Sequence, residues 1–142
     1  KLREAMRNFF VEDVSETLLI NIMSFGFKYG APGEADLVFD MRCMPNPYYV
    51  PELKHKTGLD EDVRAFVMKH EVARTLRDKL HDMIDFLLPQ YIAEGKAQLE
   101  IAIGCTGGKH RSVTFAENLY AHLLENGYKV RVLHRDIDRG KK

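Results

Sequence analysis

The sequence predicts a single three-layer α/β domain with a central, mostly parallel sheet. Short apolar runs with strand character alternate with stretches in which apolar residues recur at helical spacing, a pattern typical of parallel strands joined by crossover helices. The chain has 142 residues, the size of one ordinary domain. The run QLEIAIGC (98–105) is apolar enough to be covered on both faces, as strands of parallel sheets are.

The first half of the chain is predicted to hold two strands. Residues 1–16 are predicted to form a linker helix from an upstream domain, because the chain opens on Lys1 and we expect it to belong to a larger protein. The apolar run TLLINIMSF (17–25) is the first strand, followed by a glycine-bearing loop. DLVFDMR (36–42) is the second strand, which the Pro-Asn-Pro at 45–47 ends because proline cannot continue a central ladder.

The second half is predicted to alternate between helix and strand. Apolar residues recur at helical spacing over 60–94, and Pro89 is expected to end or kink this helix. The third strand is 98–105, and the next helix runs to Asn126-Gly127, a good C-terminal stop. The fourth strand is YKVRVLH (128–134). The loops that follow parallel strands gather at one edge of the sheet, where we expect the ligand site.

The composition excludes several classes of protein. Lysine plus arginine equals aspartate plus glutamate, 21 of each, so no overall positive field recruits nucleic acid or a membrane. Two cysteines, Cys43 and Cys105, are too few for a disulfide framework and favour the reducing cytoplasm. No apolar run has the length of a membrane span. The histidines lack metal-ligand spacing, and His81 and His122, in charged helical stretches, are expected to be exposed.

The stretch GCTGGKHRSV (104–113) lies between a predicted strand and a predicted helix. In this arrangement backbone N–H groups and the helix N-terminus face an anion. Its three glycines allow the backbone to approach a ligand closely, three basic side chains follow, and Arg111 can grip a phosphate by two hydrogen bonds. A tight turn with solvated basic residues is the simpler alternative. The number of donors favours phosphate or sulfate binding.

Two known phosphate loops can be compared with this spacing. The Walker A pattern requires a glycine where Ile103 stands and a hydroxyl where His110 stands, so the loop does not predict ATP hydrolysis.

The Cys-x5-Arg spacing of cysteine-dependent phosphatases is met by Cys105 and Arg111. Cys105 would be the nucleophile, Arg111 would hold the phosphoryl oxygens, and Asp40 or Asp136 would protonate the leaving group. The histidine that usually precedes this cysteine is Gly104 here, and a small buried hydrophobe at a strand end is an equally good interpretation of Cys105. Both interpretations stay open at this point.

Four motifs in order resemble the C-terminal domain of the RapZ/YvcJ family: SFGFKYG (24–30), ADLVFDMRCMPNP (35–47), KTGLD (56–60) and AIGCTGGKHRSV (102–113). The resemblance implies a cytoplasmic, homo-oligomeric protein whose N-terminal domain, absent here, binds ATP or GTP. Residues 17–142 would then be a C-terminal phosphosugar- and RNA-binding domain with a phosphofructokinase-like fold.

The function that the resemblance implies is regulatory, with no catalysis, cofactor or metal in this domain. The domain would sense an amino-sugar phosphate such as glucosamine-6-phosphate, or a nucleotide sugar, and contact small regulatory RNA and an endoribonuclease or another regulatory protein. The residues that match the family's sugar-phosphate pocket are Asp40, Cys105, Thr106, Gly107, Gly108, His110 and Arg111. Arg42, which neighbours Asp40, and Ser112, which supplies a hydroxyl of the loop, are predicted to bind the ligand as well. The basic residues expected to contact RNA are Arg135, Arg139, Lys141 and Lys142. Tyr48 departs from the family pattern, which has histidine there.

Overall fold

The computed structural model describes residues 18–139, built around one four-stranded sheet. Its strands are β1 (Leu19–Gly26), β2 (Leu37–Asp40), β3 (Gln98–Cys105) and β4 (Lys129–His134). All pairings are parallel and the strand order is β2-β3-β1-β4. The predicted α/β class and parallel sheet are confirmed, and each predicted strand is present. The linker helix expected at 1–16 lies outside the described residues, as do Lys141 and Lys142.

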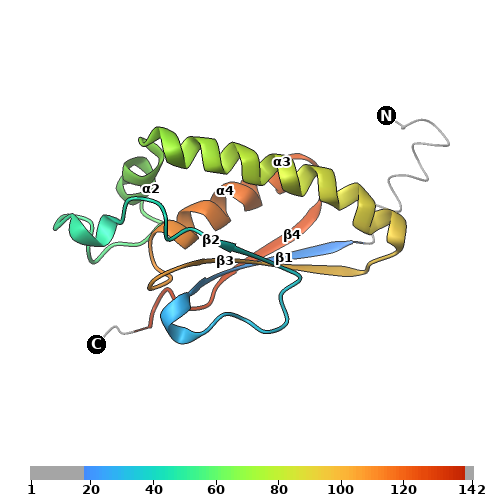
Figure 1. Ribbon diagram of the computed structural model, residues 1–142, viewed down its shortest axis with the longest axis horizontal. Helices are drawn as coiled ribbons and strands as arrows, with labels where there is room; N and C mark the ends of the chain where they lie inside the picture. Colours follow the sequence, from blue (N-terminus) through green and yellow to red (C-terminus); the bar gives the residue numbers. More distant parts are fainter. Residues whose placement is uncertain (1–17, 140–142) are drawn as a thin grey trace.

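The three α-helices of residues 18–139, α2 (Glu61–Met68), α3 (Glu71–Glu94) and α4 (Arg111–Glu125), lie on one face of the sheet (Figure 1). Helix α4 packs on β1, β3 and β4, and α3 packs beside it. The opposite face carries the segment 27–36, whose only regular structure is the 3-10 turn Phe27–Tyr29. A helical layer on this face was part of the prediction and is not found within residues 18–139. The ten-residue link from β1 to β2 is too short for a helical crossover.

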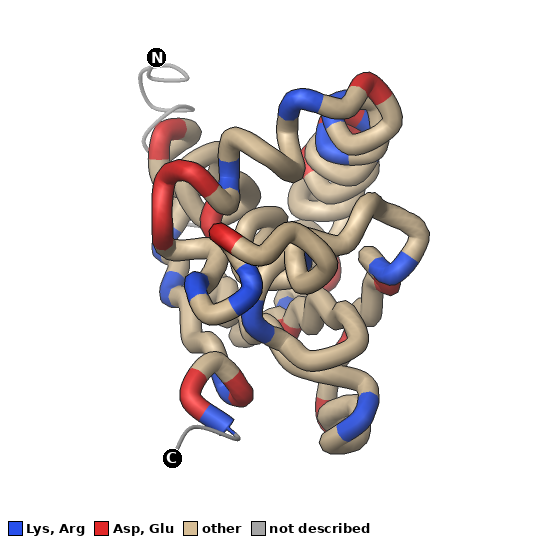
Figure 2. The backbone as a smooth tube through the Cα atoms, turned by 90° about the vertical axis from the view of Figure 1, so that its left-hand side faces the viewer, with Lys and Arg blue, Asp and Glu red and all other residues tan. Residues whose placement is uncertain are grey.

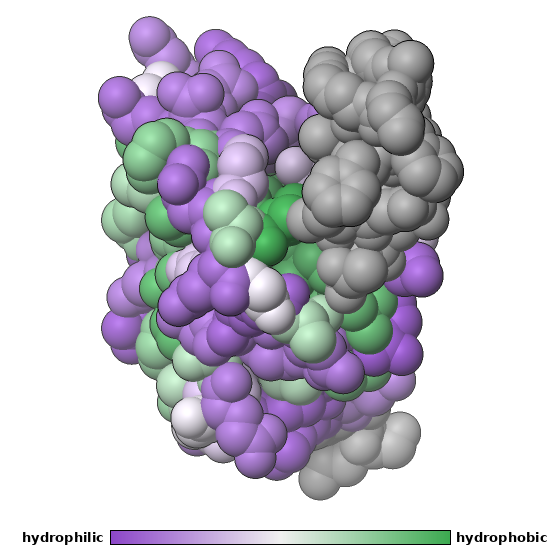
Figure 3. All heavy atoms as spheres, turned by 90° about the vertical axis from the view of Figure 1, so that its right-hand side faces the viewer, coloured by the Kyte–Doolittle hydropathy of each residue, from purple (hydrophilic) through white to green (hydrophobic). Residues whose placement is uncertain are grey.

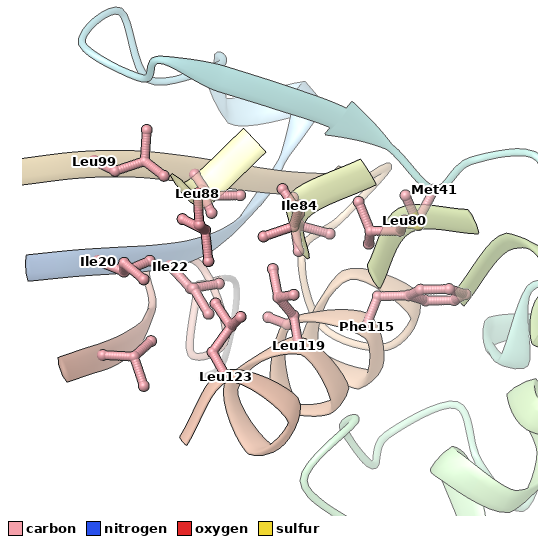
Figure 4. Close-up of a cluster of buried hydrophobic side chains, with 14 of the residues drawn as sticks. Ile20, Ile22, Met41, Leu80, Ile84, Leu88, Leu99, Phe115, Leu119 and Leu123 are labelled. Carbon is pink, nitrogen blue, oxygen red and sulfur yellow. The ribbon is translucent and has the colours of Figure 1, made fainter. Parts of the chain in front are cut away.

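The core lies between the helices and the sheet (Figure 4). Strands contribute alternate side chains to it, because successive residues of a strand point to opposite faces. The side chains that meet there, all nearly or completely buried, are Ile20, Ile22, Leu80, Ile84, Leu88, Leu99, Phe115, Leu119 and Leu123. This packing fixes α4, and with it the loop that precedes α4, against the carboxyl ends of the strands.

The helical stretch predicted over 60–94 is two helices, broken at Lys69 and His70. His70 is extended (φ −85°, ψ 133°). The Arg74 guanidinium donates hydrogen bonds to the carbonyls of Met68 (2.9 Å) and Lys69 (2.8 Å), which the end of α2 leaves without helical partners. The break is therefore held by a side chain from the next helix.

Pro89 does not end α3, contrary to one of the two predicted outcomes. The helix continues to Glu94 and ends at Gly95, whose left-handed φ of +89° suits glycine. Pro89 lies on the exposed side of α3, where water can bind the carbonyl that proline leaves without a donor.

The carboxyl ends of all four strands point toward one end of the molecule (Figure 1). The loop 106–110 between β3 and α4, which we call the glycine loop, lies at this end, as do the 3-10 turns Phe27–Tyr29 and Pro47–Tyr49. The opposite end is largely hydrophilic around a smaller apolar area (Figure 3). None of the helices between residues 18 and 139 is both long enough and apolar enough to cross a membrane.

Candidate functional site

The loop 106–110 joins β3 to α4 and packs directly on the end of β1. A Cβ added to Gly26 would lie 2.5 Å from the carbonyl carbon of Gly107, and one added to Gly108 would lie 2.6 Å from the amide nitrogen of Gly26. Gly108 also has a φ of +78°. Glycine is therefore required on both sides of this contact, which places main chain against main chain beneath the loop.

Gly104, the residue before Cys105, faces aromatic rings. A Cβ there would lie 2.4 Å from Cζ of Phe25, whose ring packs edge to face against Phe27 with centroids 4.7 Å apart. The histidine that usually precedes the cysteine in phosphatases of this spacing has no room at this position.

Arg111, at the first position of α4, is buried with 4% of its surface exposed. Its Nη1 donates to the carbonyl oxygens of Arg42 (2.9 Å) and Met44 (3.0 Å), which joins the loop after β2 to α4. Nη2 makes only a long contact, 3.4 Å, to Oγ1 of Thr106. Nε is buried and has no hydrogen-bond partner within the described residues. The edge formed by Nε and Nη2, which suits two oxygens of one anion, is therefore nearly free.

Cys105 is buried at the end of β3, and its Sγ donates to Oγ of Ser112 at 3.2 Å. Ser112 is itself fully buried in the first turn of α4. The pair joins the start and the end of the glycine loop. Cys105 lines a cavity between the glycine loop and the 3-10 turn Pro47–Tyr49, and Ser112 does not.

The KTGLD motif packs against the start of α4 through Gly58. Its N–H donates to the carbonyl of Lys109 at 2.8 Å, and a Cβ at Gly58 would lie 2.6 Å from the amide nitrogen of Thr114. His110 adds a contact between its Nε2 and the carbonyl of Leu53 at 3.2 Å. Burial lowers the pKa of His110 against the opposite effect of its backbone hydrogen bonds, so the imidazole is neutral at pH 7 and holds the loop in place.

Asp40 and Arg42 form an ion pair at the end of β2. Arg42 donates through Nε (2.9 Å) and Nη2 (2.7 Å) to the two carboxylate oxygens, and its guanidinium lies over the Phe27 ring, 3.9 Å from the centroid. The hydrogen bond from the Arg42 side chain lowers the pKa of Asp40 despite some desolvation, and the charge of Arg111 acts in the same direction. Asp40 is therefore ionised at pH 7, and its charge interacts with that of Arg111.

A cavity of about 260 Å³ opens between the glycine loop and the 3-10 turn Pro47–Tyr49. It is lined by five of the predicted ligand residues: Cys105, Thr106, Gly107, His110 and Arg111. The remaining lining residues are Lys28, Asn46, Tyr48, Tyr49 and Lys109. The prediction missed Asn46, which accepts a hydrogen bond from the Tyr48 N–H at 3.1 Å and so fixes the turn. Lysine and arginine positions gather near the middle of this end of the molecule (Figure 2).

The other predicted site residues lie beside the cavity. Asp40 and Arg42 form their exposed pair next to it, and Gly108 belongs to the contact with β1. Arg135 and Arg139 pair with Asp136 at 2.8 and 3.0 Å, so the structure places both against the protein and not on a free tail.

His81 and His122, expected to be exposed, stack on each other across α3 and α4. Their ring centroids are 4.4 Å apart, and Nε2 of His122 lies 2.9 Å from both carboxylate oxygens of Asp85. The prediction that both histidines lie in charged helical stretches is confirmed. The prediction that they are exposed is wrong, because each imidazole covers the other. No group of histidine, cysteine or acidic side chains in residues 18–139 has the geometry of a metal site.

Comparison with known proteins agrees with the motifs. The family model described as the RapZ C-terminal domain matches residues 18–138. Relatives named nucleotide-binding proteins include one from Caldicellulosiruptor saccharolyticus, 60% identical over 124 residues, which covers 87% of this chain and 42% of the relative. Another, from Bacillus cytotoxicus, is 52% identical over 141 residues, covering 99% of this chain and 48% of the relative. The chain spans less than half the length of these relatives. It belongs to the RapZ C-terminal domain family.

Proposed function

We propose that this domain binds a phosphorylated amino sugar, of the type of glucosamine-6-phosphate, or a nucleotide sugar, and acts as the sensing part of a larger cytoplasmic, homo-oligomeric regulator. The rest of that protein would bind ATP or GTP, which accords with the name nucleotide-binding protein carried by the relatives. One observation carries the proposal: Arg111 lines the cavity with its Nε–Nη2 edge nearly free.

The phosphate is assigned to the glycine loop for electrostatic reasons. Backbone N–H groups and the start of α4 supply partial positive charge, and Lys28, Lys109 and Arg111 line the same cavity. A buried guanidinium with an unused N–H group is costly unless an acceptor reaches it. A phosphate oxygen is the acceptor that this set of donors favours.

The amino-sugar part of the proposal rests on Asp40. This carboxylate is ionised, as its lowered pKa requires, and it ends β2, directly beside the strand that leads into the loop. A ligand with a phosphate at one end and an ammonium at the other would match a cationic cavity with one carboxylate at its edge. The fold similarity to phosphofructokinase, also part of the proposal, would give the same orientation of a sugar phosphate across the carboxyl ends of the strands.

The alternative function, a cysteine-dependent phosphatase, has weaker support. Cys105 is 2% exposed and donates its thiol hydrogen to Ser112, whereas the nucleophile of such enzymes is a thiolate. Asp40 is held by Arg42 on both oxygens. We therefore propose that the domain binds the phosphate ester without cleaving it. Cys105→Ser decides between binding and catalysis: a wild-type aryl phosphatase activity that is lost in this variant would support the phosphatase function.

RNA contact is proposed as a second function on the strength of the basic side chains around the cavity mouth. Lys28 and Lys109 line the cavity, and the Arg139 side chain is half exposed beside them. RNA binding through such charges weakens steeply as salt concentration rises. A binding constant independent of salt would count against it.

The test of the sugar-phosphate site is titration calorimetry with glucosamine-6-phosphate, glucose-6-phosphate and inorganic phosphate. Arg111→Lys keeps a cation but loses the two-donor edge, and we expect the affinity for all three to fall by about tenfold or more. The matched control is Glu125→Gln, at the far end of α4, which should bind as the wild type does. Failure of the wild-type protein to bind any of the three, or an unchanged affinity in Arg111→Lys, would overturn the proposal.

A further inference from the structure

The segment 135–139, after β4, folds back against the glycine loop through one carboxylate. Asp136 is completely buried. Its Oδ2 accepts a hydrogen bond from the N–H of Gly26 at 2.8 Å. Its oxygens also accept from Nη2 of Arg135 at 2.8 Å and lie 3.0 Å from Nε of Arg139. One side chain thus joins the end of β1 to the chain that follows β4.

Asp136 also touches the glycine loop itself. A Cβ added to Gly108 would lie 3.0 Å from Cβ of Asp136 and 2.6 Å from the amide nitrogen of Gly26. The end of β1, the glycine loop and Asp136 therefore meet at one point without space for another atom. The Lys109 ammonium donates to the carbonyl of Arg139, which is a second contact between the glycine loop and the segment 135–139.

The two arginines explain how a buried carboxylate is tolerated here. Burial alone would raise the pKa of Asp136, but hydrogen bonds from Arg135 and from the Gly26 N–H, together with both arginine charges, bring the pKa below its usual value. Arg135 donates further to the carbonyl of Gly30 at 2.6 Å, and Arg139 lies over the Tyr29 ring. Both guanidiniums thus contact Asp136 and the segment that follows β1, while the Arg139 side chain stays half exposed.

We propose that Asp136 is a positioning residue of the anion site: it holds the Gly26 N–H so that the glycine loop keeps the conformation that receives the phosphate, and Arg135 and Arg139 stabilise its charge. The anion-binding part of this inference rests on the function proposed above. Segment 135–139 then belongs to the sugar-phosphate site, and loss of either arginine lowers the affinity for a small phosphate even when no RNA is present.

The test uses two substitutions that remove different parts of the contact. Asp136→Asn removes the charge but keeps an oxygen that can accept from Gly26, whereas Asp136→Ala leaves the buried N–H without a partner. Because a buried N–H group without an acceptor destabilises the conformation that holds it, we expect the affinity for glucosamine-6-phosphate to fall about tenfold in Asp136→Ala. The affinity of Asp136→Asn should lie between those of the wild type and Asp136→Ala. The control is Val130→Ala, at the opposite end of β4, which should lower the melting temperature and leave affinity unchanged.

Backbone amide resonances of Gly26, Gly107 and Gly108 in ligand-free protein provide a readout independent of binding. In both Asp136 variants these three amides should shift and exchange with solvent faster, while amides of the helix α3 core keep their wild-type behaviour. If they do not move, Asp136 does not position the loop, and the inference is overturned even if no phosphate ester binds the wild type. Equal affinities of wild type and Asp136→Ala would overturn it as well, whereas absent wild-type binding with shifted amides would overturn only the function proposed for the site.

Discussion

Acidification is expected to weaken the packing of α3 on α4 through His81. This side chain is stacked on His122, and its Nε2 is buried without a hydrogen-bond partner in the described part of the chain. Burial lowers the pKa of His81 from 6.5 to about 4; the charges of His122 and Arg77 contribute in the same direction, and those of Asp85 and Asp78 oppose it. His81 is therefore neutral in the folded protein at pH 7.

The size of the effect follows from the two pKa values. As pH falls below 6.5 the unfolded chain binds the proton first, so the free energy of unfolding decreases until the folded pKa near 4 is passed. The complete shift corresponds to about 3 kcal/mol, and about 2 kcal/mol of this is lost between pH 7 and pH 5. That is a large part of the stability of an ordinary domain.

The assay is urea unfolding at pH 7 and pH 5, followed by circular dichroism because the chain has no tryptophan. His81→Gln removes the titrating group, so the variant should lose about 2 kcal/mol less than the wild type between these pH values. His110, whose pKa is also lowered by burial, is present in both proteins and cancels. Lys79→Gln, on the exposed side of α3, is the control and should follow the wild type. Equal losses in wild type and His81→Gln would refute the argument.

Three further outcomes are expected. Gly58→Ala should lower the free energy of unfolding by about 1–3 kcal/mol, because its Cβ would meet the backbone of α4; thermal unfolding measures this, and a stability equal to wild type would show that the motif can move away. Gly104→His, which restores the phosphatase pattern, should destabilise the domain because of its contact with Phe25; a stable variant with new phosphatase activity would contradict the steric argument. Asp40→Asn should cost less than about 1 kcal/mol, since its pair with Arg42 is half exposed; calorimetry should show weaker binding of glucosamine-6-phosphate and unchanged binding of glucose-6-phosphate.

The sequence allowed the strands to be predicted well because their signal is local. The bounds predicted for the third strand, 98–105, coincide with β3, since a continuous apolar run is bounded by a glycine loop. The break between α2 and α3 has no such signal: neither proline nor glycine is present at Lys69 and His70, and the break is held by Arg74 from the next turn. The missing helical layer could have been anticipated, because ten residues between β1 and β2 leave no room for a crossover helix.

For the candidate site, the glycine loop was identifiable from residue types but its supports were not. Gly26 lies where the first predicted strand (17–25) meets the loop that follows it. Its contact with Gly107 joins segments far apart in the sequence, so the sequence pattern does not reveal it. Arg135 and Arg139 were predicted to contact RNA from their charge, because local charge does not reveal that Asp136 is buried between them. The Nε–Nη2 edge of Arg111 is nearly free because Nη1 makes the hydrogen bonds to the carbonyls of Arg42 and Met44. To predict any of these contacts, one must know where a second, distant segment of the chain lies.

The contact of Gly26 with Gly107 and Gly108 has a consequence for how this domain can diverge. The base of the cavity contains no side chain there, so substitution cannot adjust it by small steps. The rim differs, because Tyr48 and Tyr49 are 47% and 79% exposed, so a substitution there removes little buried contact. On the function proposed above, descendants of one ancestral domain would change the phosphate ester that they recognise by rim substitutions alone, while the shared base would keep its fit to phosphate.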